Sequence, residues 1–427
     1  MRGRIVFAPV LCGALLAAAC TGGDAHPAAD DPNGPGAITV WLQTDAQTLW
    51  PQAVTDATAA FHQTYPDVKV TVVYQSWTDH LTKFDAAAQT GAVPDVLEFG
   101  NSETAQYIAA GALADLTTDR ASFDNSPTWL DGLTASCTGG GRLFCVPYYG
   151  GSRAVIYRKD ILADAGISRP PATWAELLAD VRAVAARHAA DPNFSAFYMP
   201  GSYPYGGLPF VFDAGGQIAT QSADGRWHAT LDSAPAQAGL AHWKTLIDAG
   251  YKGDRTKTNV NSYVQLVSGE AAMFYDTSGQ MSAVFGPKGD PALKDRIGTF
   301  ALPSPSTAGR LVPPFLGGSD LAVPKASAHP LWAREWIRSF TSSDRQKQFI
   351  DGGFLANTTT ITSADPLRAA FSAAVAHAWF VPPAPNWAQV EKDKVINQML
   401  VEVASGRPIA DATGAADAAI EKSLNQS

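Results

Sequence analysis

The sequence has 427 residues, of which 46% are hydrophobic, 17% charged and 10% aromatic. This length suits two or three domains, and the absence of a short repeat excludes a low-complexity or fibrous chain. The 31 lysines and arginines against 40 acidic residues leave a formal net charge of -9. Such a surface would repel a phosphate backbone, so the composition predicts a soluble globular protein that binds no nucleic acid.

The first twenty residues predict an export signal rather than part of the fold. Arg2 and Arg4 precede an apolar stretch that ends in small residues directly before Cys20. That stretch is shorter than the ~20 apolar residues that a membrane-spanning helix needs. It resembles a bacterial lipoprotein signal, in which the cysteine is lipidated; a plain secretory signal is the alternative. Residues 21–37 are then expected to form a flexible tether that holds the protein at the extracellular face of the cell membrane.

Cys137 and Cys145 flank a run of three glycines. In an exported protein, a pair of cysteines around a glycine turn predicts a small disulfide that closes a hairpin-like loop. A metal site is the alternative, but two thiolates with no histidine beside them fall short of a zinc ligand set. We therefore expect a disulfide, no metal and no cofactor.

From residue 38 onward, strands alternate with helices. Strands are predicted at 38–42, 68–74 and 96–99, and helices at about 79–90 and 103–110. The spacing of Trp50, Val54, Ala57 and Phe61 predicts a further helix between the first two strands. This alternation indicates a mostly parallel sheet covered by helices on both faces. Ligands of such sheets bind beyond the carboxyl ends of the strands, which are residues 43–45, 75–77 and 99–103 here.

A second unit begins near Trp129. Thr173 and Glu176 form a capping box that opens a helix. The remaining elements are expected as strands at 296–302 and 319–323 and as helices at 234–249, 261–268, 329–350, 366–378, 387–404 and 414–424. Residues 200–216 are dense in glycine, proline and aromatic residues, which favours an ordered loop.

Several short motifs occur in a fixed order along most of the chain. They are Pro66-Asp67-Val68, 91–96 (GAVPDV), 111–116 (GALADL), Val146-Pro147-Tyr148-Tyr149, 157–160 (YRKD), 171–174 (PATW), 317–323 (GGSDLAV) and Asn386-Trp387 with Gly406. In this order they resemble the extracellular solute-binding proteins of family 1, the maltose-binding-protein-like sugar-binding lipoproteins of ABC transporters.

The resemblance implies a two-lobed α/β fold of type II, with each lobe a mainly parallel sheet flanked by helices and with hinge crossovers between the lobes. By analogy, lobe one comprises residues 38–128 and 300–328, and lobe two residues 129–299 and 329–427. The implied function is to trap a mono- or disaccharide between the lobes and to deliver it, as a monomer, to ABC-transporter permease subunits. The sequence contains no GxxxxGK[ST] phosphate loop, so ATP hydrolysis would occur on a partner.

A sugar site needs aromatic rings for the C–H faces of the sugar and carboxylates or amides for its hydroxyls. On the strand ends and the resemblance, the expected ligand-binding residues are Gln43, Asp45, Trp77, Phe99, Asn101, Glu103, Tyr149, Tyr203, Tyr205, Asp276, Gly318, Ser319, Asp320 and Trp387. Trp387 is the foremost candidate, because it aligns with a tryptophan that forms a sugar platform in the family. Structural roles are the alternatives: helix capping for Asp45 and Asn101, core packing for Phe99, burial for Trp77, and hinge packing for Tyr149.

Two other functions remain open at this point. A secreted glycosidase would also place carboxylates in a sugar cleft, although no GxSxG or HExxH motif supports an enzyme. The same fold could instead bind a glycerophosphodiester or another polyol, for which Arg153 is the only obvious cation. We expect a binding protein that is not an enzyme.

Overall fold

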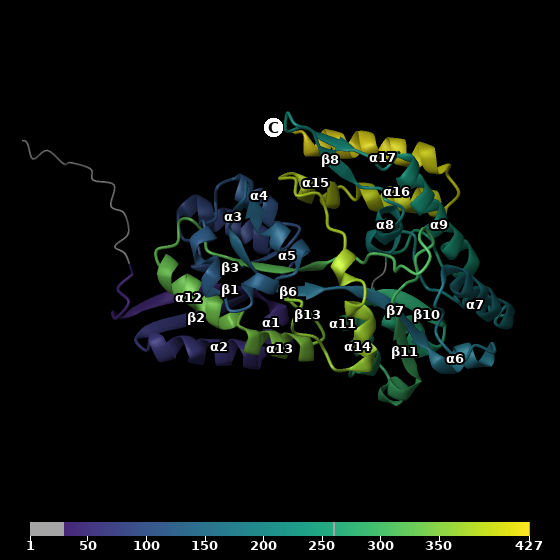
Figure 1. Cartoon of the computed structure of the whole chain (residues 1–427), viewed down its shortest axis with the longest axis horizontal. Coiled ribbons are helices and arrows are strands. Elements are labelled where there is room, and N and C mark those ends of the chain that lie inside the picture. The colour runs from purple at the N-terminus through teal and green to yellow at the C-terminus, as the bar shows by residue number, and fades with distance from the viewer. Residues whose placement is uncertain (1–29, 259–260, 427) are drawn as a thin grey trace, which may run out of the picture.

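The computed structural model describes residues 30–258 and 261–426, and Figure 1 shows them as two bodies of helices and strands lying side by side. The predicted signal, Cys20 and the first part of the tether lie outside the described residues. Within the described ranges, no helix combines the length and apolar character that crossing a membrane requires.

A six-stranded sheet forms the centre of the first body, with the strand order β13-β6-β12-β3-β1-β2. The strands are β1 (Gly36–Gln43), β2 (Val68–Gln75), β3 (Val96–Gly100), β6 (Cys145–Gly151), β12 (Gly317–Ala322) and β13 (Leu355–Ala356). β1 pairs in parallel with β2 and β3, as predicted. β12 is antiparallel to both of its neighbours and β13 is antiparallel to β6, so the sheet is parallel only in its first half.

Helices cover both faces of this sheet. They are α1 (Thr44–Leu49), α2 (Pro51–Thr64), α3 (His80–Thr90), α4 (Thr104–Ala109), α5 (Asp131–Ser136), α12 (Pro330–Phe340) and α13 (Ser343–Asp351), with the 3₁₀ helices η1 (Thr117–Ser122) and η2 (Ser126–Thr128). α2 buries the apolar face predicted from its spacing. α12 and α13 contribute Trp336 and Phe349 to the same core, although they follow residue 328, the expected end of lobe one. The helix expected at 329–350 divides at Thr341 and Ser342, where Ser342 is extended.

The predicted disulfide between Cys137 and Cys145 is confirmed. It spans a hairpin of β4 (Thr138–Gly139) and β5 (Arg142–Leu143). Gly140 and Gly141 form the turn with φ of 56° and 77°. Only glycine adopts two such successive angles without strain, which is why the triple glycine occurs here.

The second body contains a three-stranded sheet of β10 (Met273–Thr277), β7 (Arg153–Arg158) and β11 (Ile297–Phe300). β7 is antiparallel to both neighbours, so the expectation of a mainly parallel sheet is wrong for this body. The chain reaches β7 directly from β6 across Ser152, although the two strands belong to different sheets. Figure 1 shows β6 and β7 in succession, passing from the first body into the second.

Most helices of the second body pack into one large core. They are α6 (Lys159–Asp164), α7 (Trp174–Arg187), α8 (Pro204–Asp213) and α9 (Ala234–Gly250), with the hairpin β8 (Ala219–Gln221) and β9 (Trp227–Ala229). A smaller core of this body contains α10 (Tyr263–Ser268), α11 (Ser278–Phe285) and η3 (Pro291–Arg296). The predicted capping box opens α7. The loop expected at 200–216 is wrong, because α8 occupies most of it. A Cβ on Gly207 would lie 2.7 Å from Leu400, so this glycine allows close helix packing that outweighs its low helix propensity.

The C-terminal helices are α14 (Pro366–Ser372), α15 (Trp387–Lys392), α16 (Val395–Ala404) and α17 (Ile409–Leu424), with η4 (Val375–His377). The single helix expected at 387–404 is interrupted at Lys394, which has a φ of 54°. This break turns α15 away from α16. Figure 1 shows α15 at the edge of the second body that faces the first.

Candidate ligand-binding site

A cavity of about 310 Å³ lies between α8, α15 and the start of α16. Two of its lining residues, Tyr205 and Trp387, are predicted ligand-binding residues. Glu391, Lys394 and Asn397 supply its polar lining, and the rest is Pro204, Leu208, Trp379, Val381, Val390 and Ile396. Flat aromatic surface with a few polar groups is the usual composition of a small-molecule site.

The aromatic walls of this cavity are held in place by the core. Trp387 is the first residue of α15 and is 2% exposed. The ring of Tyr205 stacks on Phe315, with ring centroids 4.7 Å apart. Fixed rings give a ligand a preformed surface, which reduces the entropy lost on binding.

Glu391 lies one helical turn after Trp387, on the same face of α15. Burial raises the pKa of Glu391 to about 7; the Trp387 side chain opposes this shift and the charge of Glu103 adds to it. Glu103 precedes α4 in the first body, and its charge also contributes to the raised pKa of Tyr205. Glu103 therefore lies close enough for its charge to act on Glu391 and Tyr205.

Arg153, at the start of β7, is the centre of a buried polar cluster in the second body. Its Nε donates a hydrogen bond of 2.7 Å to the Tyr203 hydroxyl, and its guanidinium lies 4.2 Å from the ring centroid of Tyr205. The Tyr203 hydroxyl in turn donates to Oδ1 of Asp276 at 3.3 Å, and Ser262 donates to Oδ2 at 2.7 Å. Burial raises the pKa of Asp276, while the charge of Arg153 lowers it. The predicted residues Tyr203 and Asp276 are therefore linked by a hydrogen bond next to Arg153. The guanidinium of Arg153 in turn lies against the ring of Tyr205.

In the first body, the end of β1 meets a buried carboxylate that the sequence analysis missed. The backbone N–H of Gln43 donates a hydrogen bond of 2.7 Å to Oε2 of Glu98. Burial raises the pKa of Glu98 to about 8, although bonds from Gln43 and Ser319 oppose the shift. The hydroxyl oxygens of Ser319 and Tyr149 lie 3.1 Å apart. Gln43, Tyr149 and Ser319 therefore come together, but all three are buried at the base of the sheet's strand ends.

Trp77 and Asp45 join the ends of β1 and β2 at the surface. The indole N–H of Trp77 donates a hydrogen bond of 2.7 Å to Oδ2 of Asp45, and Trp77 is 38% exposed. Next to them, Nε2 of His80 lies 2.9 Å from Oε2 of Glu103. Burial lowers the pKa of His80, but the bond to Glu103 and its charge outweigh burial, so the pKa is raised overall. Trp77 is the one predicted aromatic residue of the first body with an exposed ring.

Four predicted residues have interior roles instead. Phe99 has no exposed surface and stacks on Tyr107 with centroids 4.6 Å apart, so its ring belongs to the core. Asn101 donates through Nδ2 to the carbonyl of Leu316. A Cβ on Gly318 would lie 2.1 Å from the carbonyl oxygen of Tyr149. This glycine therefore allows β12 and β6 to approach each other closely. Asp320 accepts a hydrogen bond of 2.8 Å from Thr104 and is fully buried.

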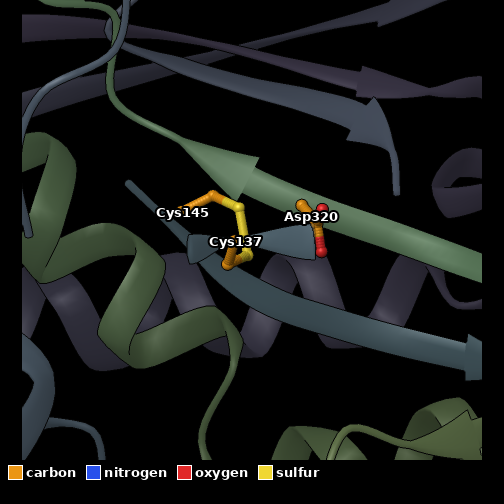
Figure 2. A group of neighbouring side chains, drawn as sticks. All are labelled: Cys137, Cys145 and Asp320. Carbon is orange, nitrogen blue, oxygen red and sulfur yellow. A yellow bond between two sulfur atoms is a disulfide. The ribbon is translucent and has the colours of Figure 1, made fainter. Parts of the chain in front are cut away.

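Figure 2 shows Asp320 beside the disulfide between Cys137 and Cys145, with ligand-type atoms of the three residues within 4.8 Å of one another. Both sulfurs are bonded to each other. They offer no thiolate, and a thiolate is the form of cysteine that binds a metal ion. The group therefore stabilises the start of β6 rather than forming a metal centre.

A second cavity, of about 230 Å³, lies between β13, α14 and the end of α13. Its lining is mostly apolar and includes Phe354, Leu355 and Phe371. It contains none of the predicted site residues and no buried carboxylate. The cavity at Tyr205 and Trp387 therefore matches the chemistry of a sugar site better.

The sequence contains a signal for each of two site residues that were not predicted, Glu98 and Glu391. Glu98 is the only charged residue of a short, otherwise apolar strand, and an ionisable residue in a buried strand needs a special partner. Glu391 follows the predicted Trp387 at the spacing that places two residues on one helix face. Trp379 also lines the cavity, but the sequence gives no signal for it, because this residue lies outside the helices and strands.

The chain resembles known proteins in both sequence and fold. Residues 41–347 match the family described as bacterial extracellular solute-binding protein. The chain is 27% identical over 438 residues to the diacetylchitobiose binding protein DasA of Streptomyces coelicolor, covering 100% of both chains. The GacH receptor of Streptomyces glaucescens has a similar fold, with a TM-score of 0.74, 21% identity and coverage of 92% of this chain and 100% of GacH. The sugar-binding protein MalE of Xanthomonas citri has a TM-score of 0.78 at 21% identity, covering 91% of this chain and 97% of MalE.

Proposed function

Because the chain belongs to the bacterial extracellular solute-binding proteins, we propose that it captures a di- or oligosaccharide between two lobes and delivers it to the permease of an ABC importer. The relatives' names support the sugar: DasA is named for diacetylchitobiose, and MalE of Xanthomonas citri is described as a sugar-binding protein. The family binds solutes without converting them, so the glycosidase alternative is set aside.

The observation that carries this proposal is the pair of aromatic walls, Tyr205 and Trp387, beside the carboxylate of Glu391. Rings stack on the C–H faces of a sugar, and a carboxylate accepts hydrogen bonds from hydroxyls at its rim. In this proposal Trp77 and Asp45 complete the site from the first lobe. The polyol-phosphate alternative has less support, because the charge of Arg153 is already matched by Tyr203 and Asp276.

We propose that ligand binding favours a closed arrangement of the lobes about the passage from β6 to β7 and about β12. A ligand shifts such an equilibrium only through contacts that it makes better in the closed form. In this scheme lobe one is centred on residues 38–128, with β6, β12, β13, α12 and α13 added because they belong to its sheet and core. Lipidation of Cys20 after signal cleavage stays a proposal; a Cys20→Ser variant released from the membrane fraction would support it, and an unchanged membrane-bound fraction would oppose it.

The test of the binding function is calorimetric titration of the purified chain, residues 21–427, with diacetylchitobiose, maltose and maltotetraose. Binding of at least one sugar with micromolar affinity, about -8.2 kcal/mol, is expected. Each sugar is then recovered and analysed by chromatography, and it should be unchanged. Absence of binding to every saccharide would refute the proposal.

A further inference from the structure

We infer that the sugar bound by this chain carries a protonated amino group, and that Glu391 holds this group as an ion pair at the edge of the cavity lined by Tyr205 and Trp387. The inference rests on the proposed function and narrows it to sugars with a free, non-acetylated amine. It stands on the position of Glu391 and on the pairing of the charges around it.

Glu391 is a carboxylate on a cavity wall with no matching cation. Among the described residues, no lysine, arginine or histidine makes an ion pair with it, and no positive charge lowers its pKa. Lys394 lines the same cavity, but its side chain is exposed to solvent. Burying an unmatched carboxylate is costly, so a cation in this cavity would be strongly favoured.

The other charged groups near the cavity are already engaged. Arg153 bonds to Tyr203 and lies near Asp276, and the Glu103 carboxylate lies against His80. On α17, which packs against α15, Asp417 accepts hydrogen bonds from the backbone N–H groups of residues 231 and 232. Glu391 therefore remains as the carboxylate available to a ligand.

An ammonium group suits this position better than a hydroxyl or an acetamide. It donates charge-assisted hydrogen bonds to Glu391, and the faces of Tyr205 and Trp387 attract a nearby cation. The charge of Glu103 in the opposite lobe acts in the same direction. An acetylated nitrogen is neutral and gains neither of these charge interactions.

Proton release from Glu391 on binding distinguishes an amino sugar from a neutral sugar. In the free protein the pKa of Glu391 is raised to about 7, chiefly by burial, so near neutral pH part of the population holds a proton there. An ammonium group favours the ionised carboxylate and lowers its pKa, so Glu391 releases protons on binding, while any amine that was neutral in solution takes up protons. A neutral sugar carries no such charge, so it lowers the pKa of Glu391 less and releases fewer protons. Affinity for the amino sugar should also weaken as pH falls below about 7.

The experiment is calorimetric titration near pH 7 with three disaccharides: fully deacetylated chitobiose, diacetylchitobiose and cellobiose. Titrations in two buffers of different ionisation enthalpy measure the net proton exchange, and adding the protons that the neutral fraction of the free amine takes up gives the release from Glu391. We expect deacetylated chitobiose to bind at least about tenfold more tightly than cellobiose, equivalent to about 1.4 kcal/mol, with proton release. Glu391→Gln should remove both this preference and the proton release.

Asp393→Asn is the matched control, because it removes a negative charge two residues away on an exposed side chain. It should keep the preference, and thermal melting checks that both variants fold. Equal or weaker binding of deacetylated chitobiose in the wild type, or binding without proton release, overturns the inference while the sugar-binding function stands. Failure of every saccharide, including the neutral ones, would refute the proposed function and the inference with it.

Discussion

Trp387 and Glu391 lie one helical turn apart on α15 and line the same cavity, so a single helix supplies both an apolar wall and an acidic rim. The break at Lys394 ends this helix and lets α15 turn toward the first body. A short helix thus positions two groups that differ in chemistry and act on the same ligand.

Two substitutions of Trp387 separate its contribution to the cavity wall from its contribution to the stability of the core. Trp387→Phe keeps a ring but shortens the wall, and we expect sugar affinity to fall by about tenfold, or about 1.4 kcal/mol, in calorimetric titration. Trp387→Ala should also lower stability by about 3 kcal/mol or more, because the side chain is 2% exposed. Trp243→Phe is the matched control: this tryptophan is fully buried in α9 and does not line the cavity. Its affinity should equal that of the wild type, and an equal loss in both Phe variants would contradict a direct contact.

Glu98 makes the stability of the first body depend on pH. Burial raises its pKa to about 8 in the folded chain against an ordinary 4.5, so the folded state keeps a proton that the unfolded state releases. The contribution of Glu98 to the free energy of unfolding is complete below pH 4.5 and is lost as pH rises through about 8. Glu98→Gln, which resembles the protonated form, should therefore flatten the decline in denaturation midpoint between about pH 5 and pH 8.

The control for that experiment is Glu270→Gln, a substitution at an exposed carboxylate in the second body. Its midpoints should follow the wild-type pH profile. A Glu98→Gln profile that coincides with the wild type over the whole range would show that Glu98 is ionised in the folded chain.

Arg153 and Asp276 should show strong coupling. Arg153→Met leaves Asp276 buried without its nearby cation, and breaking such a pair costs about 3–5 kcal/mol. Arg153→Met combined with Asp276→Asn should cost clearly less than the sum of the two single changes. A double-mutant cycle by urea denaturation measures this difference, and additive costs would mean that the two charges act independently.

Removing the disulfide tests its part in the fold. Cys137→Ser with Cys145→Ser opens a loop of eight residues' separation, which should lower stability by about 2–3 kcal/mol. The thermal midpoint measures the loss. Sugar affinity should change by less than about twofold, because neither cysteine lines the cavity. A large loss of affinity would instead place this hairpin in the binding mechanism.

The sequence predicts the first body well where the pattern is local. β1, α2 and β2 follow from apolar spacing, since each buries a continuous face. α8 could not be predicted in the same way, because its glycines and prolines disfavour a helix and tertiary packing decides its form. The antiparallel second sheet depends on the pairing of β7 with β10 and β11, which follow much later in the chain, and no local pattern records such long-range pairing.

In the candidate site, too, some residues could be predicted from local sequence and others depend on tertiary packing. Tyr205 and Trp387 were predicted and do line one cavity. Phe99 has the right residue type at a strand end, but packing with Tyr107 draws it into the core. Side-chain direction at a strand end is fixed by neighbours from distant segments, so sequence position alone does not distinguish a platform from a core ring.

Calorimetric titration of the wild-type chain with the saccharide panel, followed by recovery of each sugar, tests the central proposal most directly. We expect saturable binding of at least one di- or oligosaccharide, weakened by Trp387→Phe but not by Trp243→Phe, with the sugar recovered uncut. Titrations without binding for every saccharide, or recovery of cleaved sugar, would contradict it.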